Sequence, residues 1–358
     1  MKKNLKNKNT ATNFLTYAVV IIAFVVLQVL SSLGLLSRSV QGYLIPACCY
    51  IVLAVSLNLL VGVCGELSLG HAGFMGIGAF SGVVVAALLQ PVMGNDILRL
   101  VAAMIVGGIL AGVMGFLIGI PVLRLRGDYL AIVTLAFGEI LKNIIGNLYV
   151  GSDSRGFHFA ISTKMMELRE GGSFIIAGPK GTTGVEKLAS FPVAFVLILF
   201  TLFVVLNLVN SKEGRAIKAI KENRIAAESV GINVTAFRMK AFVVSAVLAG
   251  MAGALFGLNY SSISASKFNF NTSINILVFV VLGGMGNILG SVVSATVLYV
   301  LPEALRELED YRMILYAVVL IVVMLCTWSP KIKGSIAVVM AGIRKKFTKK
   351  RKAGGTNE

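Results

Sequence analysis

Long unbroken apolar runs restrict the fold of this chain more than any other feature. A transmembrane helix needs about 20 mostly apolar residues, and runs of about that size lie at residues 14–36, 43–61, 67–90, 98–121, 128–150, 191–210 and 241–259. A longer run at 273–302 is divided by GGMGN at 283–287, and 312–327 adds a last one. Only 14% of the residues are charged, against 57% hydrophobic, which is typical of membrane proteins. The runs predict an all-α polytopic membrane helix bundle with about ten transmembrane helices.

Basic residues at both ends of the chain predict its orientation. Lysines occur at 2, 3, 6 and 8, and FTKKRK follows the last apolar run at 347–352. Because Lys and Arg favour the cytoplasmic side and the expected number of spans is even, both termini are expected in the cytoplasm. The expected domains are a basic cytoplasmic tail at 1–13, a transmembrane domain at 14–328 and a basic cytoplasmic tail at 329–358. The net charge of +17 then favours membrane lipid over nucleic acid as a partner.

Two hydrophilic segments separate the apolar runs. The segment at 151–190 is expected outside the cell and the segment at 211–240 in the cytoplasm. Between Arg215 and Val230 the second segment has the spacing of a short amphipathic helix, which Gly231 ends. Its expected apolar side carries Ile217, Ile220, Ala227 and Val230, and its hydrated side carries Lys218, Lys221, Glu222 and Arg224. By spacing alone, such a helix either lies on lipid headgroups or binds a groove on a soluble partner.

The residues needed for catalysis or for a metal site are scattered along the chain. His71 and His158 are the only histidines, and no acid or cysteine stands near them at ligand spacing. The motif G-x-x-x-x-G-K-[ST] does not occur, so the chain has no P-loop of its own for ATP. We therefore expect a protein that is not an enzyme and that holds no cofactor or metal.

The stretch GELSLGHAGFMGIGAF at 65–80 places Glu66 and His71 in or beside an apolar run, where ionisable side chains are costly. In a structural interpretation, Glu66 is a carboxylate in the first turn of a helix and His71 is a hydrogen-bonded imidazole. In a functional interpretation, a helix broken at Gly65 or Gly70 presents these groups to a translocation path. A second glycine cluster, expected to allow a sharp backbone reversal within the membrane, contains Gly283, Gly284 and Gly286.

A possible ion pair lies in the fifth apolar run. Glu139 and Lys142 are three residues apart, which places them on one face of a helix. We expect a structural pair, because each charge lowers the cost of burying the other. An ion-coupled secondary transporter, an alternative class for such a chain, would more often place acidic residues at mid-membrane depth without a partner.

Five segments, in order along the chain, resemble one known family. They are GELSLGHAGFMGIGAF at 65, LRLRGDYLAIVTLAFGEI at 123, GTTG at 181, KENRIAAESVGINV at 221 and VVLGGMGNILG at 280. Together they resemble the permease subunit of branched-chain amino acid ABC transporters of the LivM type. Ala226, Ala227 and Gly231 also match a cytoplasmic loop motif of bacterial ABC importer permeases, although Ile225 stands where that motif has Glu.

The resemblance implies a transport subunit in the cell membrane of a bacterium, which forms half of a translocation pathway for leucine, isoleucine and valine. The implied partners are a second related permease, two cytoplasmic subunits that bind ATP, and an external substrate-binding protein. Residues 214–232 are implied to form the coupling helix, with contacts to the ATPase assigned to Ile217, Ile220, Arg224, Ala226, Ala227 and Gly231. Uptake of urea or short amides, which similar permeases carry, stays open as an alternative.

Overall fold

The computed structural model describes residues 2–34, 37–125, 127–153, 156–160, 173–305 and 311–328. The chain divides into two compact units, residues 1–299 and 300–358. The second unit contains the end of α11 and helix α12 (Arg312–Trp328), and the elements discussed below belong to the first. The expected C-terminal tail at 329–358 lies outside the described residues.

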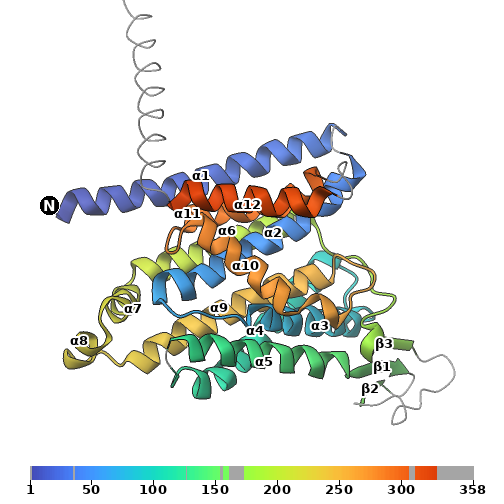
Figure 1. The fold of residues 1–358 in the computed structure, drawn as a ribbon. Helices are drawn as coiled ribbons and strands as arrows, with labels where there is room; N and C mark the ends of the chain where they lie inside the picture. Colours follow the sequence, from blue (N-terminus) through green and yellow to red (C-terminus); the bar gives the residue numbers. More distant parts are fainter. Residues whose placement is uncertain are drawn as a thin grey trace, which may run out of the picture. The chain divides into compact units, whose positions relative to one another are not determined.

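Helices make up most of the described chain (Figure 1). They are α1 (Lys2–Ser32), α2 (Arg38–Asn58), α3 (His71–Leu89), α4 (Asp96–Val122), α5 (Asp128–Gly146), α6 (Phe191–Asn210), α7 (Lys212–Glu222), α8 (Arg224–Ser229), α9 (Val234–Gly257), α10 (Phe270–Gly283) and α11 (Ile288–Ala304). Helix α1 begins at Lys2, so the residues expected as a separate N-terminal tail continue into the first apolar run as one helix.

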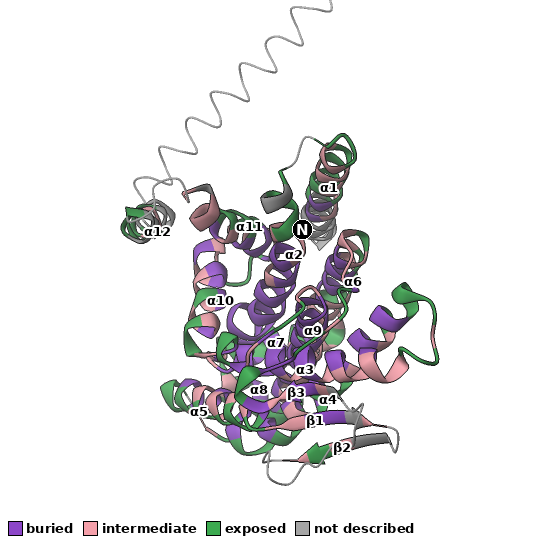
Figure 2. Cartoon of the chain, turned by 90° about the vertical axis from the view of Figure 1, so that its right-hand side faces the viewer, coloured by how far each residue is buried: buried purple, intermediate pink, exposed green. Residues whose placement is uncertain are grey.

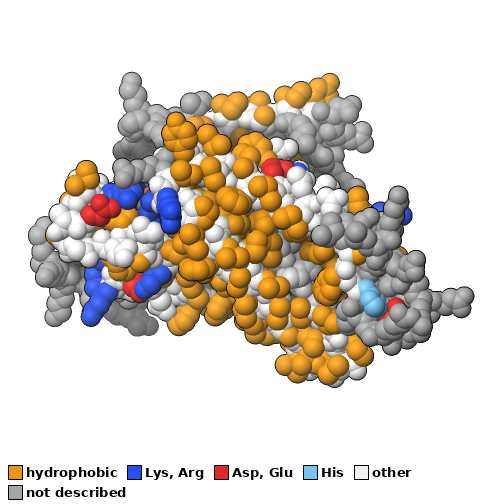
Figure 3. Space-filling model, turned by 90° about the horizontal axis from the view of Figure 1, so that it is seen from below, with side chains coloured by type: hydrophobic (Ala, Val, Ile, Leu, Met, Phe, Trp, Pro, Cys, Tyr) orange, Lys and Arg blue, Asp and Glu red, His pale blue; other side chains and the backbone are white. Residues whose placement is uncertain are grey.

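Seven described helical segments are long and apolar enough to cross a membrane. They are Val40–Cys64, His71–Leu89, Asp96–Val122, Asp128–Gly146, Phe191–Asn210, Val234–Gly257 and Ala265–Gly283. An apolar helix suits lipid because its backbone polar groups bond within the helix. Figure 3 shows apolar side chains across the middle of one face and basic side chains gathered at one end. The expected membrane helix bundle is confirmed, with seven spans supported by length and composition.

Close packing of α3, α4 and α9 forms the centre of the first unit, where buried residues gather (Figure 2). A Cβ atom added to Gly78 on α3 would lie 1.9 Å from the carbonyl oxygen of Gly250 on α9. A Cβ atom added to Gly250 would in turn lie 2.6 Å from the carbonyl oxygen of Gly107 on α4. These helices therefore approach backbone to backbone, which only small residues permit.

Two interruptions break the helical path within the first unit. Helix α2 runs into a π-helical turn, η1 (Leu59–Cys64), and residues 65–70 before α3 are not helical. Gly65 has φ 78°, in the left-handed region that favours glycine. Residues 284–287 separate α10 from α11, with φ 91° at Gly284 and 85° at Gly286. Both glycine clusters thus coincide with breaks.

A small antiparallel sheet occupies part of the segment that was expected as an external loop. Its strands are β1 (Tyr149–Asp153), β2 (Gly156–Ala160) and β3 (Ser173–Ala177), in the order β2-β1-β3. The all-α prediction is wrong here, because YVGSD, GFHFA and SFIIA contain aromatic and β-branched residues that favour strands. Thr182 ties the following segment to Ile263, with 2.9 Å from the Thr182 N–H nitrogen to the Ile263 carbonyl oxygen.

Within the segment at 211–240, two short helices, α7 and α8, replace the single helix expected between Arg215 and Val230, and α9 begins at Val234. Asn223 separates α7 from α8 in an extended conformation, with φ −155° and ψ 106°. Its side-chain oxygen accepts the Ala226 N–H at 3.1 Å, and an N-cap of this kind favours a new helix start over continuation. In Figure 1, α7 and α8 lie at the opposite end of the first unit from the strands.

Candidate functional site

Glu66 anchors the first helix break by an ion pair. Its Oε2 lies 2.5 Å from Nη2 of Arg238 on α9. Arg238 is 2% exposed and also donates from Nη1 to the Leu123 carbonyl, beyond the end of α4, at 3.1 Å. A buried guanidinium is costly unless its charge is paired and its N–H groups are bonded. The expected place of Glu66 in the first turn of a helix is wrong, because α3 begins only at His71.

His71 bridges two helices beside this break. It is 1% exposed, and its Nε2 lies 2.9 Å from the hydroxyl oxygen of Ser56 on α2. The Ser56 hydroxyl donates to the Leu53 carbonyl at 3.0 Å, so we assign the proton between His71 and Ser56 to Nε2. This tautomer leaves Nδ1 as an acceptor, for which the described residues provide no partner.

Neighbouring helices bond the backbone around Gly70. A Cβ atom on Gly70 would lie 2.2 Å from the Thr134 carbonyl oxygen on α5, so this position has room for glycine only. The Leu69 N–H donates to Thr134 Oγ1 at 3.0 Å, and the Ala72 N–H donates to Ser273 Oγ on α10 at 3.0 Å. The start of a helix leaves such N–H groups without partners in the helix itself. Hydroxyls on α5 and α10 therefore stabilise the break.

Asn58, fully buried at the end of α2, holds the second break. Its Oδ1 accepts the Gly286 N–H at 2.7 Å, and its Nδ2 donates to the Asn287 carbonyl at 3.1 Å and to Ser291 Oγ at 2.8 Å. A Cβ atom on Gly62 would lie 2.1 Å from the Gly286 nitrogen, so the two breaks touch. Sequence reasoning missed Asn58, although an amide within an apolar run was an available signal.

The backbone reversal between α10 and α11 depends on glycines that approach one another. A Cβ atom on Gly283 would lie 2.5 Å from the carbonyl carbon of Gly290, one turn into α11. Gly284 and Gly286 supply the positive φ angles of the turn itself. The structure therefore brings the three glycines singled out from the sequence to a single turn, which contacts η1 through Asn58 and Gly62.

Lys221 connects helix α7 to the first break. Lys221 is exposed, as the helical spacing predicts. Its ammonium also donates to the Gly62 carbonyl in η1 at 2.7 Å. A Cβ atom on Gly65 would lie 2.9 Å from Lys221 Cγ, so the lysine stem packs on the turn that follows η1. The hydrophilic segment thus reaches the point where both helix breaks meet.

The two faces of α7 and α8 have separate environments. Ile217, Ile220 and Ala227 are buried within this chain, where Ile220 and Ala227 pack with Val234. Val230 was expected on the same apolar side, but this expectation is wrong, because its side chain is 74% exposed. Ala226 is also exposed. Ile225 is 79% exposed, so it and Val230 form an apolar surface on this otherwise hydrophilic segment.

Charged groups surround this exposed face. Arg224 forms an ion pair with Glu228, with 2.9 Å between Nε and Oε1. Desolvation lowers the pKa of the Lys218 ammonium from its usual value. Gly231 has φ 82° and ends the segment with open space around it. Ile225, Ala226 and Val230 are thus exposed on and after α8, beside the Arg224–Glu228 ion pair.

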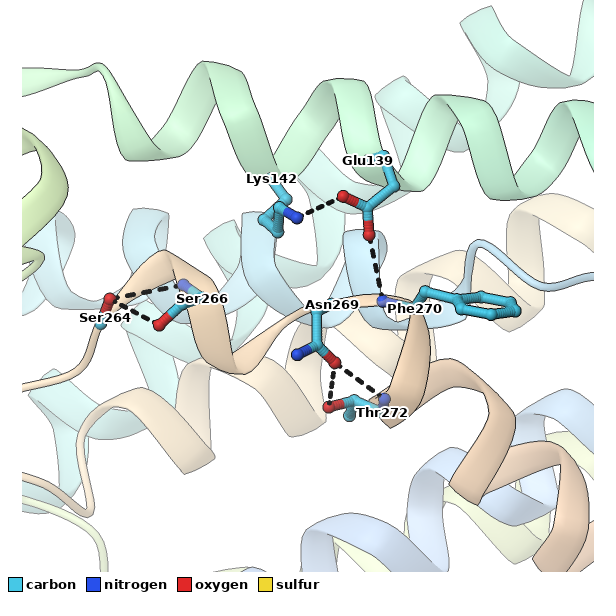
Figure 4. A network of polar contacts seen from close by, with 7 residues as sticks. All are labelled: Glu139, Lys142, Ser264, Ser266, Asn269, Phe270 and Thr272. Carbon is cyan, nitrogen blue, oxygen red and sulfur yellow. Dashed lines mark hydrogen bonds and ion pairs between the residues drawn. The ribbon is translucent and has the colours of Figure 1, made fainter.

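Glu139 and Lys142 form an ion pair on α5 (Figure 4). The second carboxylate oxygen of Glu139 accepts the Phe270 N–H at 3.1 Å, at the first residue of α10. Sequence spacing indicated the pair but not this contact across 131 residues. Within the described residues, no group of three or more His, Cys, Asp or Glu lies close enough to hold a metal ion.

Seven described helices that are long and apolar enough to cross a membrane, with a hydrophilic helical segment between two of them, indicate a multi-pass membrane protein. A family model described as "Branched-chain amino acid transport system / permease component" matches residues 39–325. The chain belongs to this family, and the resemblance inferred from the five motifs is confirmed. The chain is thus a transport component rather than an enzyme.

Individual relatives agree with the family match. The chain is 35% identical over 292 residues to the high-affinity branched-chain amino acid transport system permease protein LivM of Salmonella typhimurium, a match that covers 79% of this chain and 67% of the relative. The same figures hold for LivM of Escherichia coli K12. A probable LivH permease protein of Methanocaldococcus jannaschii is 27% identical over 248 residues, 68% of this chain and 64% of the relative. No solved structure matches the chain.

Proposed function

We propose that this chain forms one half of the translocation pathway of a bacterial ABC importer for leucine, isoleucine and valine. The family match over residues 39–325 is the observation that carries this proposal. Similarity to both LivM and LivH permeases supports a second, related permease as the other half. Two cytoplasmic ATP-binding subunits and an external substrate-binding protein complete the proposed importer, and ATP is bound by the partners.

The proposed topology has ten spans with both termini in the cytoplasm. The spans are α1, α2 with η1, α3, α4, α5, α6, α9, α10, α11 and α12. This order assigns α7 and α8 to the cytoplasm and the three-stranded sheet to the outside. Five basic residues on α7 and α8 support the assignment, because Lys and Arg favour the cytoplasmic side.

The proposed coupling mechanism begins at the exposed face of α7 and α8. An ATPase subunit contacts Ile225 and Val230, and its closure moves both helices as one body, because Ala227 on α8 packs with Ile220 on α7. Lys221 passes this movement to η1 through the Gly62 carbonyl. The turns at 65–70 and 284–287, which both contact the α2–η1 end, can then change the angles between the helices that they join.

The alternatives differ in substrate or in energy source. An importer for urea or short amides would share the architecture, but the LivM relatives are named as permeases for branched-chain amino acids. An ion-coupled transporter would work without ATPases, and Glu139, a carboxylate within a proposed span, is already bonded to Lys142 and to Phe270. The main proposal therefore has the stronger support.

Uptake of labelled leucine in cells with and without this chain tests the proposal. We expect uptake at low concentration to require the chain and to be inhibited by unlabelled isoleucine and valine but not by urea. Other leucine carriers are deleted first, so that they do not hide the effect. Leucine uptake that continues unchanged without the chain would move the proposed substrate to urea or a short amide.

A further inference from the structure

A cavity with a volume of about 420 Å³ opens beside the start of α10. Its apolar wall includes Tyr50, Phe256 and Phe268. The Tyr50 and Phe256 rings meet edge to face with 6.2 Å between centroids, and Phe256 meets Phe268 in the same way at 6.2 Å. Because such contacts restrict ring orientation, the wall is a preformed apolar surface.

The cavity lies at the end of α9 that is far from α7 and α8. Phe256 and Arg238 are both part of the continuous helix α9, and the rise of an α-helix separates them by about 27 Å. With α7 and α8 in the cytoplasm, as proposed above, this end of α9 faces the outside. The cavity is therefore at the side from which an imported solute arrives.

The turn that forms one rim of the cavity is held by hydrogen bonds (Figure 4). Asn269 Oδ1 accepts the Thr272 N–H at 3.0 Å, and Thr272 Oγ1 donates to the Lys267 carbonyl at 2.8 Å. Glu139 bonds the Phe270 N–H from the neighbouring helix α5. These contacts fix the backbone positions of the rim, and Glu139 acts as a positioning residue.

Three polar side chains on or next to this rim retain unused bonding capacity. The Lys267 ammonium lies 4.5 Å from the centroid of the Tyr260 ring, and no described carboxylate forms an ion pair with it. Asn271 and Asn275 are exposed, one turn apart on α10, and their side chains form no hydrogen bond with any residue the structure describes. Unpaired amides are costly against lipid, so this face of α10 borders water or a partner.

We propose that this cavity is the entry site for an α-amino acid with a branched aliphatic side chain, an inference that rests on the proposed function. The Lys267 ammonium binds the α-carboxylate, and the amide oxygen of Asn271 accepts from the α-ammonium. The side chain packs on the aromatic wall of Tyr50 and Phe256, which supplies apolar contact. Urea has neither a charge nor an apolar side chain, so it gains little from these groups.

The first test compares two lysine substitutions in cells that carry the complete importer. Lys267→Met is expected to lower the maximal rate of leucine uptake about tenfold, because a charge-assisted hydrogen bond to the carboxylate is lost. Lys267→Arg keeps a cation and is expected to retain most of the rate. Lys187→Met removes an equally exposed lysine between β3 and α6, and it is expected to change the rate less than about twofold. Saturating leucine and matched amounts of protein in the membrane make the rates comparable.

The second test measures protection of a thiol in the cavity. In right-side-out membrane vesicles, Ser266→Cys, an exposed position on the cavity that the proposal does not use for binding, is treated with an impermeant thiol reagent in a chain that also carries Cys326→Ser. Cys48, Cys49 and Cys64 are buried. Free leucine is expected to slow the reaction at least about threefold, and urea is expected to leave it unchanged. Ser261→Cys, at an exposed position near the same end of α9, is expected to react at one rate with or without leucine.

The outcomes separate this inference from the proposed function. Failure of the unmodified chain to support leucine uptake would remove the proposed function and the entry site with it. If the unmodified chain supports uptake, but Lys267→Met behaves like Lys187→Met and leucine does not protect Ser266→Cys, the entry site is refuted and the importer stands. A lower rate for Lys267→Met together with selective protection by leucine supports both.

Discussion

Asn58 is a polar residue within an apolar run, and its side chain is fully buried. Its three hydrogen bonds join the end of α2 to the turn between α10 and α11, more than 220 residues later in the chain. Gly286 and Asn287 are exposed, whereas Ser291 is buried. Loss of the amide therefore costs most at Ser291, since water can replace the bonds to the exposed groups.

Asn58→Leu is expected to destabilise the folded chain by about 1–3 kcal/mol, because one buried hydroxyl loses its partner and a hydrogen-bonded junction is broken. The measurement is the midpoint of thermal unfolding of the purified chain in detergent. Asn147→Leu is the matched control, because the Asn147 side chain is exposed and bonds only one turn back, to the Asn143 carbonyl. Equal midpoints for the two variants would contradict the assigned role of Asn58.

Glycines on helix α3 pack directly against neighbouring helices. A glycine can be replaced by a larger residue only where an added Cβ atom has space. Gly78 faces the backbone of Gly250 so closely that an added methyl group would force α3 and α9 apart. Gly42, on helix α2, has no atom within 4 Å of an added Cβ. The two helical glycines thus have opposite requirements, although nothing in their residue type distinguishes them.

Gly78→Ala is expected to destabilise the chain by about 1–3 kcal/mol through overpacking. Gly42→Ala is expected to be neutral or slightly stabilising, because alanine favours a helix over glycine by about 1 kcal/mol. Thermal unfolding of both variants in detergent, beside the unmodified chain, checks the difference. A Gly78→Ala variant as stable as Gly42→Ala would mean that α3 and α9 do not pack as closely as described.

Helices α7 and α8 have one face that is buried in this chain and one exposed face, which is the proposed contact with an ATPase subunit. Ile225→Asp is expected to abolish copurification of ATP-binding subunits and to lower uptake at least about tenfold, with no loss of protein from the membrane. Val92→Asp is the control, since Val92 is 78% exposed in the loop after α3. Replacement of 217–231 by a flexible linker is a less selective test, because it also removes the buried Ile217 and Ile220. Normal copurification with Ile225→Asp would refute the proposed ATPase contact.

The first unit places different chemistry at its two ends. Helices α7 and α8 lie at one end of the first unit and the three-stranded sheet at the other (Figure 1). The coupling proposal needs the first end in the cytoplasm, and the entry site needs the second end outside. Both proposals therefore depend on one orientation, which the basic residues at both ends of the sequence predict.

Thiol labelling of intact cells is expected to give one pattern for the ten-span topology. Lys187→Cys, in the segment after the sheet, is expected to react with an impermeant reagent. Cysteine variants of Lys6, Lys218 and Lys346 are expected to react only after the membrane is permeabilised. Labelling of either terminal position in intact cells would change the number of spans, and labelling of Lys218→Cys would overturn the cytoplasmic assignment of α7.

Particular residues show how far sequence analysis reached into the site. The glycine clusters correctly indicated the breaks before α3 and after α10, because glycine is favoured where φ is positive or backbones touch. Spacing also brought Glu139 and Lys142 onto one helical face. Spacing was misleading for α7 and α8, since an Asn223 cap divides the predicted helix and turns Val230 outward. The strands were missed because the dominant membrane signal led to an all-α prediction.

Local features of the sequence were enough to predict the helical membrane bundle, the turns at its glycine clusters and the transporter family. These follow from apolar runs that only helices can satisfy in lipid and from ordered motifs along the chain. The folded chain was needed to show that Glu66 pairs with Arg238, that Asn58 joins both turns, and that Lys267 borders an aromatic cavity. Such pairings connect residues far apart in sequence, and their energies depend on burial and on distances that exist only after the helices pack.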